Sequence, residues 1–142
     1  MIRPAVPQEI PLLADIWLRA SRRSHDFIPA EYWESSLDAM VEEHLPGADE
    51  LLVLEMEGRV IGFAALNGER LEALFVDPEL QSYGHGSRLM AHAMVHHSRL
   101  TLCVFSRNVR AVSFYRRLGF QVVEERLEPL TGELETLMAW QS

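Results

Sequence analysis

The residues with the clearest chemical potential form a glycine-containing turn that follows an apolar run. The run is Leu71–Val76, and Asp77-Pro78 ends it because proline cannot donate a hydrogen bond within a sheet. The turn consists of Gln81, Ser82, Tyr83, Gly84, His85, Gly86 and Ser87. Glycine lets the backbone approach a ligand closely, and a helix that begins at Gly84 adds unpaired N–H groups and a positive dipole end. These features predict a cradle for a phosphate or pyrophosphate group.

Two common phosphate-binding motifs are excluded by the same residues. A P-loop needs a Lys-Ser or Lys-Thr pair after its glycines, and none follows Gly86. A dinucleotide-binding fingerprint needs a third glycine at the position where this chain has Leu89. The turn therefore belongs to another type of phosphate-binding site.

A second segment with chemical potential, Asn108–Phe120, follows the next apolar run. Asn108, Ala111 and Tyr115 recur at helical spacing, so they share one face of a helix that ends at Gly119. In this order and at this separation, the two segments resemble the GNAT superfamily of acyl-CoA-dependent N-acetyltransferases. The turn matches the family signature (Arg/Gln)-x-x-Gly-x-(Gly/Ala) at Gln81, Gly84 and Gly86. The second segment matches the family element at Asn108, Ala111, Phe114, Tyr115, Gly119 and Phe120.

The resemblance implies a binding site for acetyl-CoA and no metal. In the family, the main chain of the strand before the turn pairs with the pantetheine arm, and Leu74, Phe75 and Val76 occupy that place here. The pyrophosphate is then expected over the amides from about Ser82 to Ser87, with Asn108 on the pantetheine or substrate side.

Two residues are candidates for the chemistry of acetyl transfer. The resemblance places Tyr115 near the CoA sulfur, where a phenol eases departure of a thiolate by donating a hydrogen bond or a proton. The alternative is a core aromatic whose hydroxyl finds a partner. Glu72 is the candidate base for the acceptor amine, because strand alternation puts it on the sheet face of Leu74 and Val76. The alternative is a solvated or salt-bridged carboxylate.

The resemblance implies that the loop between the first two helices lines the acceptor side. His25, Asp26 and Phe27 lie there as candidate substrate-binding residues, and His25 is an alternative base. Peptide N-terminal acetyltransferases of the superfamily often carry a glutamate five residues before the asparagine. Cys103 stands at that position here, which argues against the ribosomal-protein type of activity.

The length indicates a single domain, and the resemblance implies that it is a GNAT-like domain over residues 1–142. The formal net charge of −8 argues against nucleic acid or an anionic membrane as a partner. One cysteine excludes an intrachain disulfide, and His92 and His96 form a helical i,i+4 pair without a third metal ligand. No secretory leader or membrane-spanning run is visible, so we expect a cytoplasmic protein. The resemblance implies a monomer or homodimer.

The elements that must position these residues follow from hydrophobic periodicity. The expected strands are Met1–Ala5, Leu51–Glu55, Val60–Leu66, Leu71–Val76, Leu100–Phe105, Gln121–Leu127 and Glu133–Trp140. The expected helices are residues 8–22, Ala30–Leu45, one from Gly84 and one from Asn108. This order predicts an α/β (α+β) fold with a mixed, mostly antiparallel sheet of six to seven strands and about four helices.

The combined interpretation is an enzyme that moves acetyl from acetyl-CoA to a primary amine. The acceptor is expected to be a small molecule or amino acid that attacks directly in a ternary complex. One alternative is a protein or peptide acetyltransferase. An alternative of another class is a non-catalytic acyl-CoA-binding sensor, against which Tyr115 and Glu72 argue.

Overall fold

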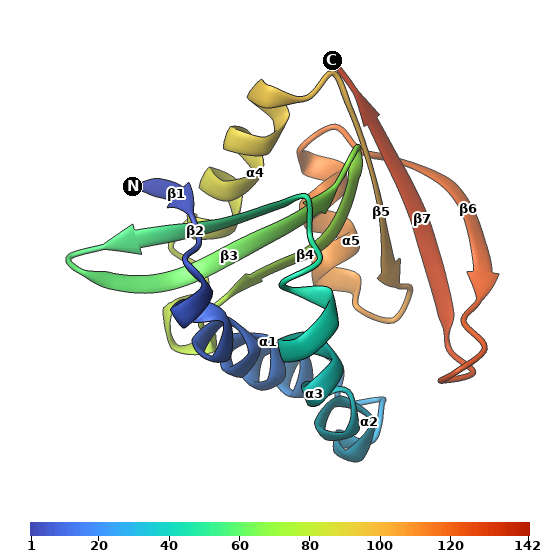
Figure 1. Cartoon of the computed structure of the whole chain (residues 1–142). Helices are drawn as coiled ribbons and strands as arrows, with labels where there is room; N and C mark the ends of the chain where they lie inside the picture. The colour runs from blue at the N-terminus through green and yellow to red at the C-terminus, as the bar shows by residue number, and fades with distance from the viewer.

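Seven strands form one sheet in the order β1-β2-β3-β4-β5-β7-β6 (Figure 1). The structure, a computed structural model, describes residues 1–142. Every neighbouring pair is antiparallel except β4 and β5, which are parallel. The strands are β1 Ile2–Pro4, β2 Glu50–Met56, β3 Arg59–Asn67, β4 Arg70–Val76, β5 Arg99–Phe105, β6 Gln121–Leu127 and β7 Leu134–Gln141. The predicted mixed, mostly antiparallel sheet is confirmed.

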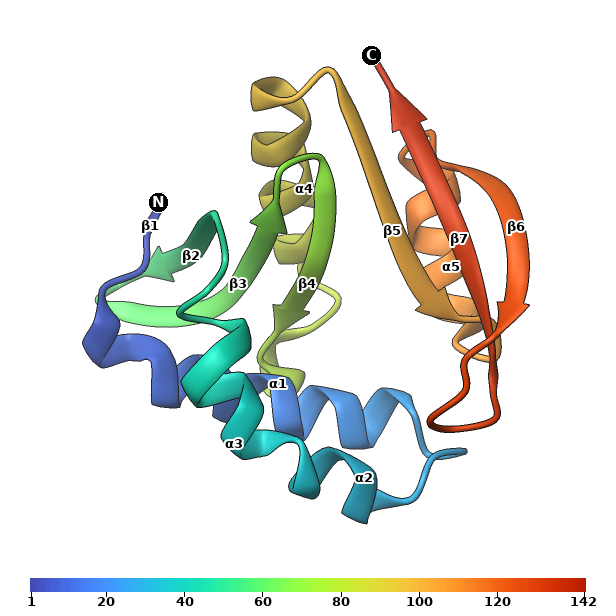
Figure 2. The same cartoon turned by 45° about the vertical axis from the view of Figure 1, so that its right-hand side comes forward.

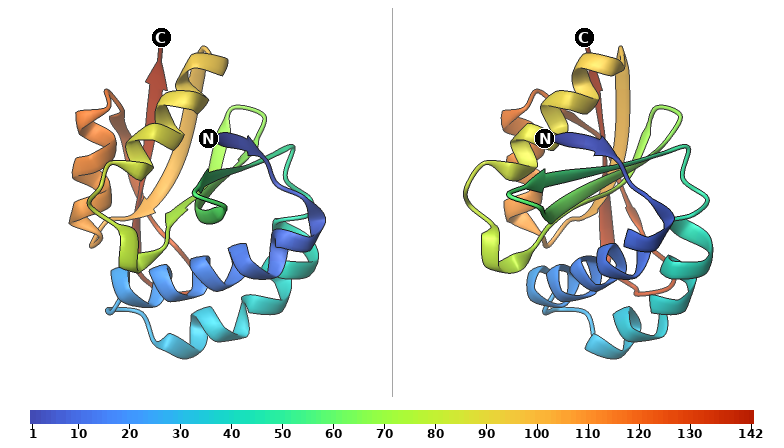
Figure 3. Two further views of the ribbon diagram at one scale, coloured as in Figure 1. Left: turned by 90° about the vertical axis from the view of Figure 1, so that its left-hand side faces the viewer. Right: turned by 60° about the vertical axis from the view of Figure 1, so that its left-hand side comes forward.

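Helices cover both faces of this sheet (Figure 3). The helices are α1 Ile10–Ser24, α2 Ala30–Ser35, α3 Leu37–Ala39, α4 His85–His96 and α5 Val109–Arg117. One apolar core joins α4 and α5 to the strands, with Leu89 and Tyr115 among its buried members. A second core joins α1 and α2 to the strands, with Leu13 and Trp33 buried in it. No helix has the length and apolar character needed to span a bilayer.

The segment expected as one helix over Ala30–Leu45 is divided in the structure, so that expectation is wrong. It consists of α2, α3 and a π-helical turn at Met40–His44. The hydroxyls of Ser35 and Ser36 each donate a hydrogen bond of 2.9 Å to the Tyr32 carbonyl. Such bonding of a side chain to the preceding turn competes with the helical pattern and bends it, which ends α2 at this point.

The central pair of strands, β4 and β5, separates soon after it begins. Its one register pair joins Arg70 to Thr101, and Figure 2 shows the two strands starting close together and then diverging. On its other side, β4 stays paired with β3 up to its end. Helix α1 lies across the open end of the gap (Figure 2). The divergence leaves one edge of β4 unpaired in the middle of the sheet.

The pairing of β4 with β3 decides which main-chain groups point into this gap. Val76 lies opposite Gly62, and the Asp77 N–H donates a hydrogen bond of 2.8 Å to the Ile61 carbonyl. Because hydrogen-bonding direction alternates along an antiparallel strand, the main-chain groups of Leu74 and Val76 point the other way. They face the gap, where no neighbouring strand satisfies them.

A β-bulge in β4 changes the placement of Glu72. Leu71 pairs with Leu66 while Ala73 pairs with Ala65, which leaves Glu72 as an extra residue. As a result, Leu71 and Leu74 contact the same apolar core although three positions separate them. The alternation used to place Glu72 on the sheet face of Leu74 and Val76 therefore fails. Its carboxylate instead lies 3.2 Å from the Arg70 guanidinium.

A buried carboxylate fixes the end of β4 to α1. Asp77 is 4% exposed and accepts two hydrogen bonds of 3.1 Å from the Arg19 guanidinium. It also accepts hydrogen bonds from Arg59, at 3.3 Å, and from the Glu79 N–H, at 3.0 Å. The Arg19 guanidinium is the largest cause that holds the pKa of Asp77 below its ordinary value. No local pattern in the sequence predicts this contact, because 58 positions separate Arg19 from Asp77.

We expect Asp77→Asn to lower the free energy of unfolding by about 2 kcal/mol at neutral pH, because charged hydrogen bonds to a buried group are lost. The pKa of Asp77 is lowered on folding, so its contribution is present above the unfolded-state value near 3.8 and is lost as pH falls through the folded-state value. Urea denaturation at several pH values measures the difference. Asp15→Asn is the control, because the exposed Asp15 contacts the same guanidinium. Equal losses for both variants would contradict the assignment.

Candidate functional site

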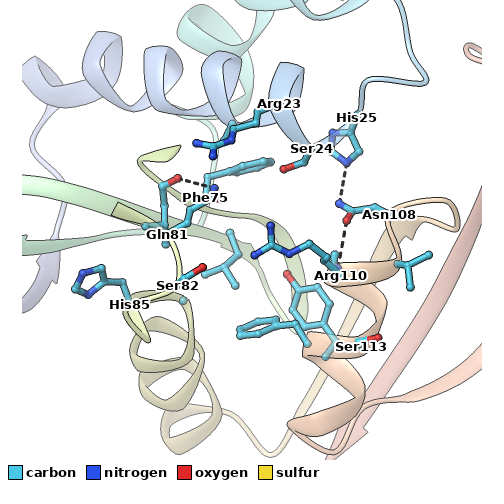
Figure 4. A pocket seen from close by; sticks show the side chains of 18 of the residues that line it. Arg23, Ser24, His25, Phe75, Gln81, Ser82, His85, Asn108, Arg110 and Ser113 are labelled. Carbon is cyan, nitrogen blue, oxygen red and sulfur yellow. Dashed lines mark hydrogen bonds between the residues drawn. The ribbon is translucent and has the colours of Figure 1, made fainter. Parts of the chain in front are cut away.

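A cavity of about 990 Å³ occupies the gap between β4 and β5. Its walls come from the C-terminal end of α1 and the following loop, the end of β4, the turn before α4, and α5. Figure 4 shows Arg23, His25, Gln81, Asn108 and Arg110 around it. Segments far apart in the sequence therefore meet where the sheet is open.

The glycine turn forms one wall through its backbone. Gly84 caps α4 with a left-handed φ of 81°, which favours glycine. The first helical bond runs from the Arg88 N–H to the Gly84 carbonyl at 3.1 Å, so the amides of residues 85 to 87 have no partner within the helix. A Cβ added at Gly86 would meet open space except for the Phe114 ring at 3.5 Å. Ser82 is also left-handed, with φ 72°, which the sequence did not reveal.

Most of the residues predicted to bind the cofactor line this cavity. They are Leu74, Phe75, Val76, Gln81, Ser82, Gly84, His85, Gly86, Ser87 and Asn108. Tyr83 is absent from the walls, and 73% of it is exposed to solvent. The Gln81 side chain donates a hydrogen bond of 3.3 Å to the Val76 carbonyl, which ties the turn to the end of β4.

Tyr115 lies on the cavity wall and is buried among aromatic side chains. Its ring contacts Phe114 and Phe120 edge-on, with centroids 5.1 and 5.6 Å away. Burial raises the pKa of the Tyr115 hydroxyl above its ordinary value of 10.0. The phenol therefore stays protonated at neutral pH and is able to donate a proton or a hydrogen bond into the cavity.

The three residues predicted on the acceptor side, His25, Asp26 and Phe27, also line the cavity. His25 is 8% exposed, and burial lowers the pKa of its imidazole. Both of its ring nitrogens are engaged, Nδ1 at 3.1 Å from the Ser21 carbonyl and Nε2 at 3.1 Å from the Asn108 amide nitrogen. This occupancy argues against His25 as the base for an acceptor amine.

Glu72 and the histidine-rich end of α4 lie outside the cavity walls. Glu72 is on the surface beside Arg70. The rings of His92 and His96 stack with centroids 4.4 Å apart, and Nδ1 of His96 contacts the His92 carbonyl. No group of three or more histidine, cysteine, aspartate or glutamate residues is arranged to hold a metal.

Sequence reasoning missed the cationic part of the cavity. Arg110, Ser113 and Arg117 line it from one side of α5, and Arg23 lines it from α1. Neither Arg110 nor Arg117 forms an ion pair within the chain, whereas Arg107 pairs with Glu133 at 3.0 Å. The three- and four-residue spacing on α5 was the available signal, because residues so spaced share a helix face.

Comparison with known proteins agrees with this geometry. Residues 47–122 match the family model of the acetyltransferase (GNAT) domain. The peptidyl-lysine N-acetyltransferase YiaC of Escherichia coli K12 is 32% identical over 99% of this chain and 96% of YiaC. The peptidyl-lysine N-acetyltransferase YjaB of the same strain is 36% identical over 85% of this chain and 82% of YjaB.

Solved structures share the fold over the whole chain. Apo-form YjaB from Escherichia coli has a TM-score of 0.86 at 32% identity, over 99% of this chain and 96% of that one. The PaiA N-acetyltransferase of Thermoplasma acidophilum, solved in complex with coenzyme A, has a TM-score of 0.78 at 19% identity, over 100% and 98%. The family match and the two relatives above 30% identity show that this chain belongs to the GNAT superfamily and is an acyl-CoA-dependent N-acetyltransferase.

Proposed function

We propose that this enzyme transfers acetyl from acetyl-CoA to lysine side chains of proteins or peptides. The observation that carries the proposal is the similarity to YiaC, a peptidyl-lysine N-acetyltransferase, over nearly the full length of both chains. YjaB, which carries the same description, supports it over most of its length. The comparisons thus favour a peptide or protein acceptor over the free amino acid or small amine that the sequence alone suggested.

The proposed acetyl-CoA site uses the unpaired edge of β4 and the start of α4. Main-chain groups of Leu74 and Val76 face the gap and suit an extended arm rich in amides, as pantetheine is. The amides of residues 85 to 87 at the N-terminus of α4 suit a pyrophosphate. The related fold of PaiA, solved with coenzyme A, supports a ligand of this class.

The arginines of α5 are proposed to contact the phosphate groups of the same ligand. Arg110 and Arg117 line the cavity without an ion-pair partner, and Ser113 lies between them on the same face. Guanidinium groups bind phosphate through charge-assisted, often bidentate hydrogen bonds. A protein of net charge −8 repels the negatively charged phosphate groups of the ligand, and the arginines would offset this repulsion at the site.

We expect Arg110→Ala and Arg117→Ala each to weaken acetyl-CoA binding by about tenfold, because one charge-assisted contact is lost. The dissociation constant is measured by calorimetry at low and high salt, and the defect should shrink at high salt. Arg116→Ala is the matched control, since Arg116 lies on the same helix but outside the cavity walls. A loss at Arg116 equal to that at Arg110 would indicate only a general charge effect.

In the proposed reaction, the neutral lysine amine attacks the acetyl carbonyl directly. The Val76 N–H faces the gap and would stabilise the negative charge that develops on the carbonyl oxygen. Tyr115 would donate its proton, or a hydrogen bond, to the departing sulfur. An amine with a pKa near 10.4 must lose a proton before attack, so a base or a water chain to a carboxylate is also needed.

Glu72 is still proposed as the base, although it lies on the surface beside Arg70 and outside the cavity walls, so it would have to act through a chain of water molecules. Glu72→Gln is expected to lower the rate near neutral pH, with a defect that shrinks as pH rises and more amine is already neutral. A pH–rate profile measures this, with Glu69→Gln as control because Glu69 is also exposed and lies beside Arg99. A profile parallel to that of the wild type would remove Glu72 from the mechanism and make Asp26, which lines the cavity, the next candidate.

The acceptor class is tested with an Nα-blocked peptide that contains one lysine, assayed with acetyl-CoA for free thiol and by mass spectrometry. The controls are the same peptide with arginine in place of lysine, free lysine and a short diamine. The proposal expects kcat/KM to be largest for the lysine peptide and no transfer to the arginine peptide. Faster transfer to free lysine or to the diamine would overturn it in favour of a small-molecule enzyme.

A further inference from the structure

A chain of hydrogen bonds connects the C-terminal end of α1 to the N-terminus of α5 across the open end of the gap. The Ser21 carbonyl contacts Nδ1 of His25, and Nε2 of His25 contacts the side-chain nitrogen of Asn108, each at 3.1 Å. The side-chain oxygen of Asn108 accepts a hydrogen bond of 3.2 Å from the Ala111 N–H, so it caps α5. Figure 4 shows the contact between His25 and Asn108. Eighty-three positions separate these two residues in the sequence.

The hydrogen-bond partners of its two ring nitrogens determine the protonation state of His25. A carbonyl oxygen only accepts, so Nδ1 of His25 must carry its hydrogen toward Ser21. The Asn108 oxygen is committed to the Ala111 N–H, so the Asn108 amide nitrogen must donate toward His25. Nε2 of His25 is therefore the acceptor, and the imidazole is neutral with its hydrogen on Nδ1.

Aromatic rings hold the imidazole in this orientation. Trp33 stacks on it with centroids 5.1 Å apart, and Phe27 and Phe105 approach edge-on at 5.7 and 5.3 Å. Such an environment penalises a charged imidazole, in agreement with the lowered pKa of His25. The ring is thus fixed in position and kept neutral, as a hydrogen-bond acceptor requires.

We propose that neutral His25 is a positioning residue that orients the Asn108 amide, and that its protonation releases this amide. This goes beyond the proposed acceptor class and depends only on acetyl-CoA as the ligand. A proton on Nε2 would face the donor nitrogen of Asn108. The amide would have to turn over, which would remove the cap from α5 and change the cavity wall that Asn108 and Tyr115 share. The affinity for acetyl-CoA then falls at acidic pH because His25 is protonated, and not only because the ligand itself titrates.

No charged side chain near His25 accounts for the expected loss of acetyl-CoA affinity on acidification. The charged side chains that line the same cavity nearby are Arg23 and Asp26 on its own segment and Arg107 beside Asn108. None of them forms an ion pair with His25, and Arg107 is paired with Glu133. The titratable side chains of α2 are Glu31, Tyr32 and Glu34. Tyr32 packs against Trp33, Glu34 pairs with Arg22 at 3.5 Å, and neither glutamate forms an ion pair with His25. His25 is therefore the group in this contact that gains a proton on acidification, with its pKa lowered from the ordinary value by burial.

The first test uses the free protein and needs no activity. Nitrogen-15 NMR of the His25 ring is expected to show a hydrogen on Nδ1 and none on Nε2 at neutral pH. On acidification, the signal of the Asn108 side-chain amide should change together with protonation of His25. A hydrogen on Nε2 at neutral pH, or an Asn108 amide that ignores the titration, would overturn the proposal. This outcome is independent of which acceptor the enzyme uses.

The second test separates packing from hydrogen bonding through three variants. His25→Phe keeps an aromatic ring but removes the acceptor, and it should weaken acetyl-CoA binding by about fivefold to tenfold at neutral pH. His25→Gln keeps an acceptor oxygen that does not titrate, so it should retain near-normal affinity and lose the decline in acid. Asn108→Ala should weaken binding by itself, and His25→Phe should add nothing in that background.

The measurement is the dissociation constant of acetyl-CoA by calorimetry from pH 5 to 8. Phosphate groups of the ligand also titrate near pH 6, so the ratio of His25→Gln to wild type at each pH is the quantity compared. Thermal unfolding without ligand shows whether each variant is folded. Additive losses in the double variant, or the same acid decline in His25→Gln as in the wild type, would show that His25 acts only through packing.

Discussion

Tyr115→Phe is expected to lower kcat by roughly tenfold to a thousandfold with little change in the dissociation constant of acetyl-CoA. The substitution removes one hydroxyl from the cavity wall and keeps the ring that contacts Phe114 and Phe120. Because burial already keeps the phenol protonated, the lost group is a proton donor rather than a base. Single-turnover measurements report the chemical step directly.

A matched control for this substitution lies in the glycine turn. Tyr83 is 73% exposed and lies outside the cavity walls, so Tyr83→Phe should leave both kcat and acetyl-CoA affinity unchanged. The defect in Tyr115→Phe should also shrink with an acyl thioester of lower leaving-group pKa, which needs less help to depart. A normal single-turnover rate for Tyr115→Phe would exclude Tyr115 from the mechanism.

Gly86→Val is expected to weaken acetyl-CoA binding by about a hundredfold and to abolish the rise in Tm that the ligand produces. Gly86 lies at the start of α4 on the cavity wall, where an added Cβ meets only the Phe114 ring at 3.5 Å. The Cβ of a valine would therefore make only ordinary contact with the protein, and its methyl groups would occupy space in front of the amides proposed to hold the pyrophosphate. The thermal shift with and without acetyl-CoA measures the effect.

Two further substitutions make this test specific. Gly84→Val should also lose binding, but φ of 81° strains any side chain there, so the loss would include a folding defect. Ala91→Val adds a similar volume to an exposed position of α4 and should bind normally. Wild-type affinity in Gly86→Val, with the protein folded, would mean that this turn is not the pyrophosphate site.

Local sequence patterns predicted the parts of the fold that depend on local chemistry. Gly58 stands between the expected strands Leu51–Glu55 and Val60–Leu66, and the structure has Glu57 and Gly58 at φ of 53° and 76°, as a tight hairpin turn between β2 and β3 requires. The glycine turn before α4 and the start of a helix at Asn108 were predicted from local residues in the same way, and the structure adds that Asn108 caps α5. In each case a residue with a special backbone or capping preference stands where the chain must turn or begin a helix.

The parts of the fold that could not be predicted depend on contacts between distant segments, on an irregularity in strand pairing, or on side chains that compete locally for backbone hydrogen bonds. The Arg19–Asp77 and His25–Asn108 contacts join residues 58 and 83 positions apart, and no periodicity indicates such pairs. The bulge at Glu72 broke an alternation argument that needs regular pairing. Hydroxyls at the end of α2 competed with the backbone and divided a helix whose apolar spacing was otherwise continuous.

The gap between β4 and β5 reduces the number of hydrogen bonds that hold the centre of the sheet together. Amides in the middle of a sheet normally exchange with solvent deuterium most slowly, and those at its margins exchange fastest. Here the amides of Leu74 and Val76 lie at the centre but face no strand, so we expect them to exchange fast in the free protein. A ligand that pairs with them, as proposed for acetyl-CoA, would act as an extra strand along the least hydrogen-bonded part of the sheet. Binding and release of the ligand in each catalytic cycle would then raise and lower the rigidity of the central strands, while the outer strands of the sheet stay unchanged.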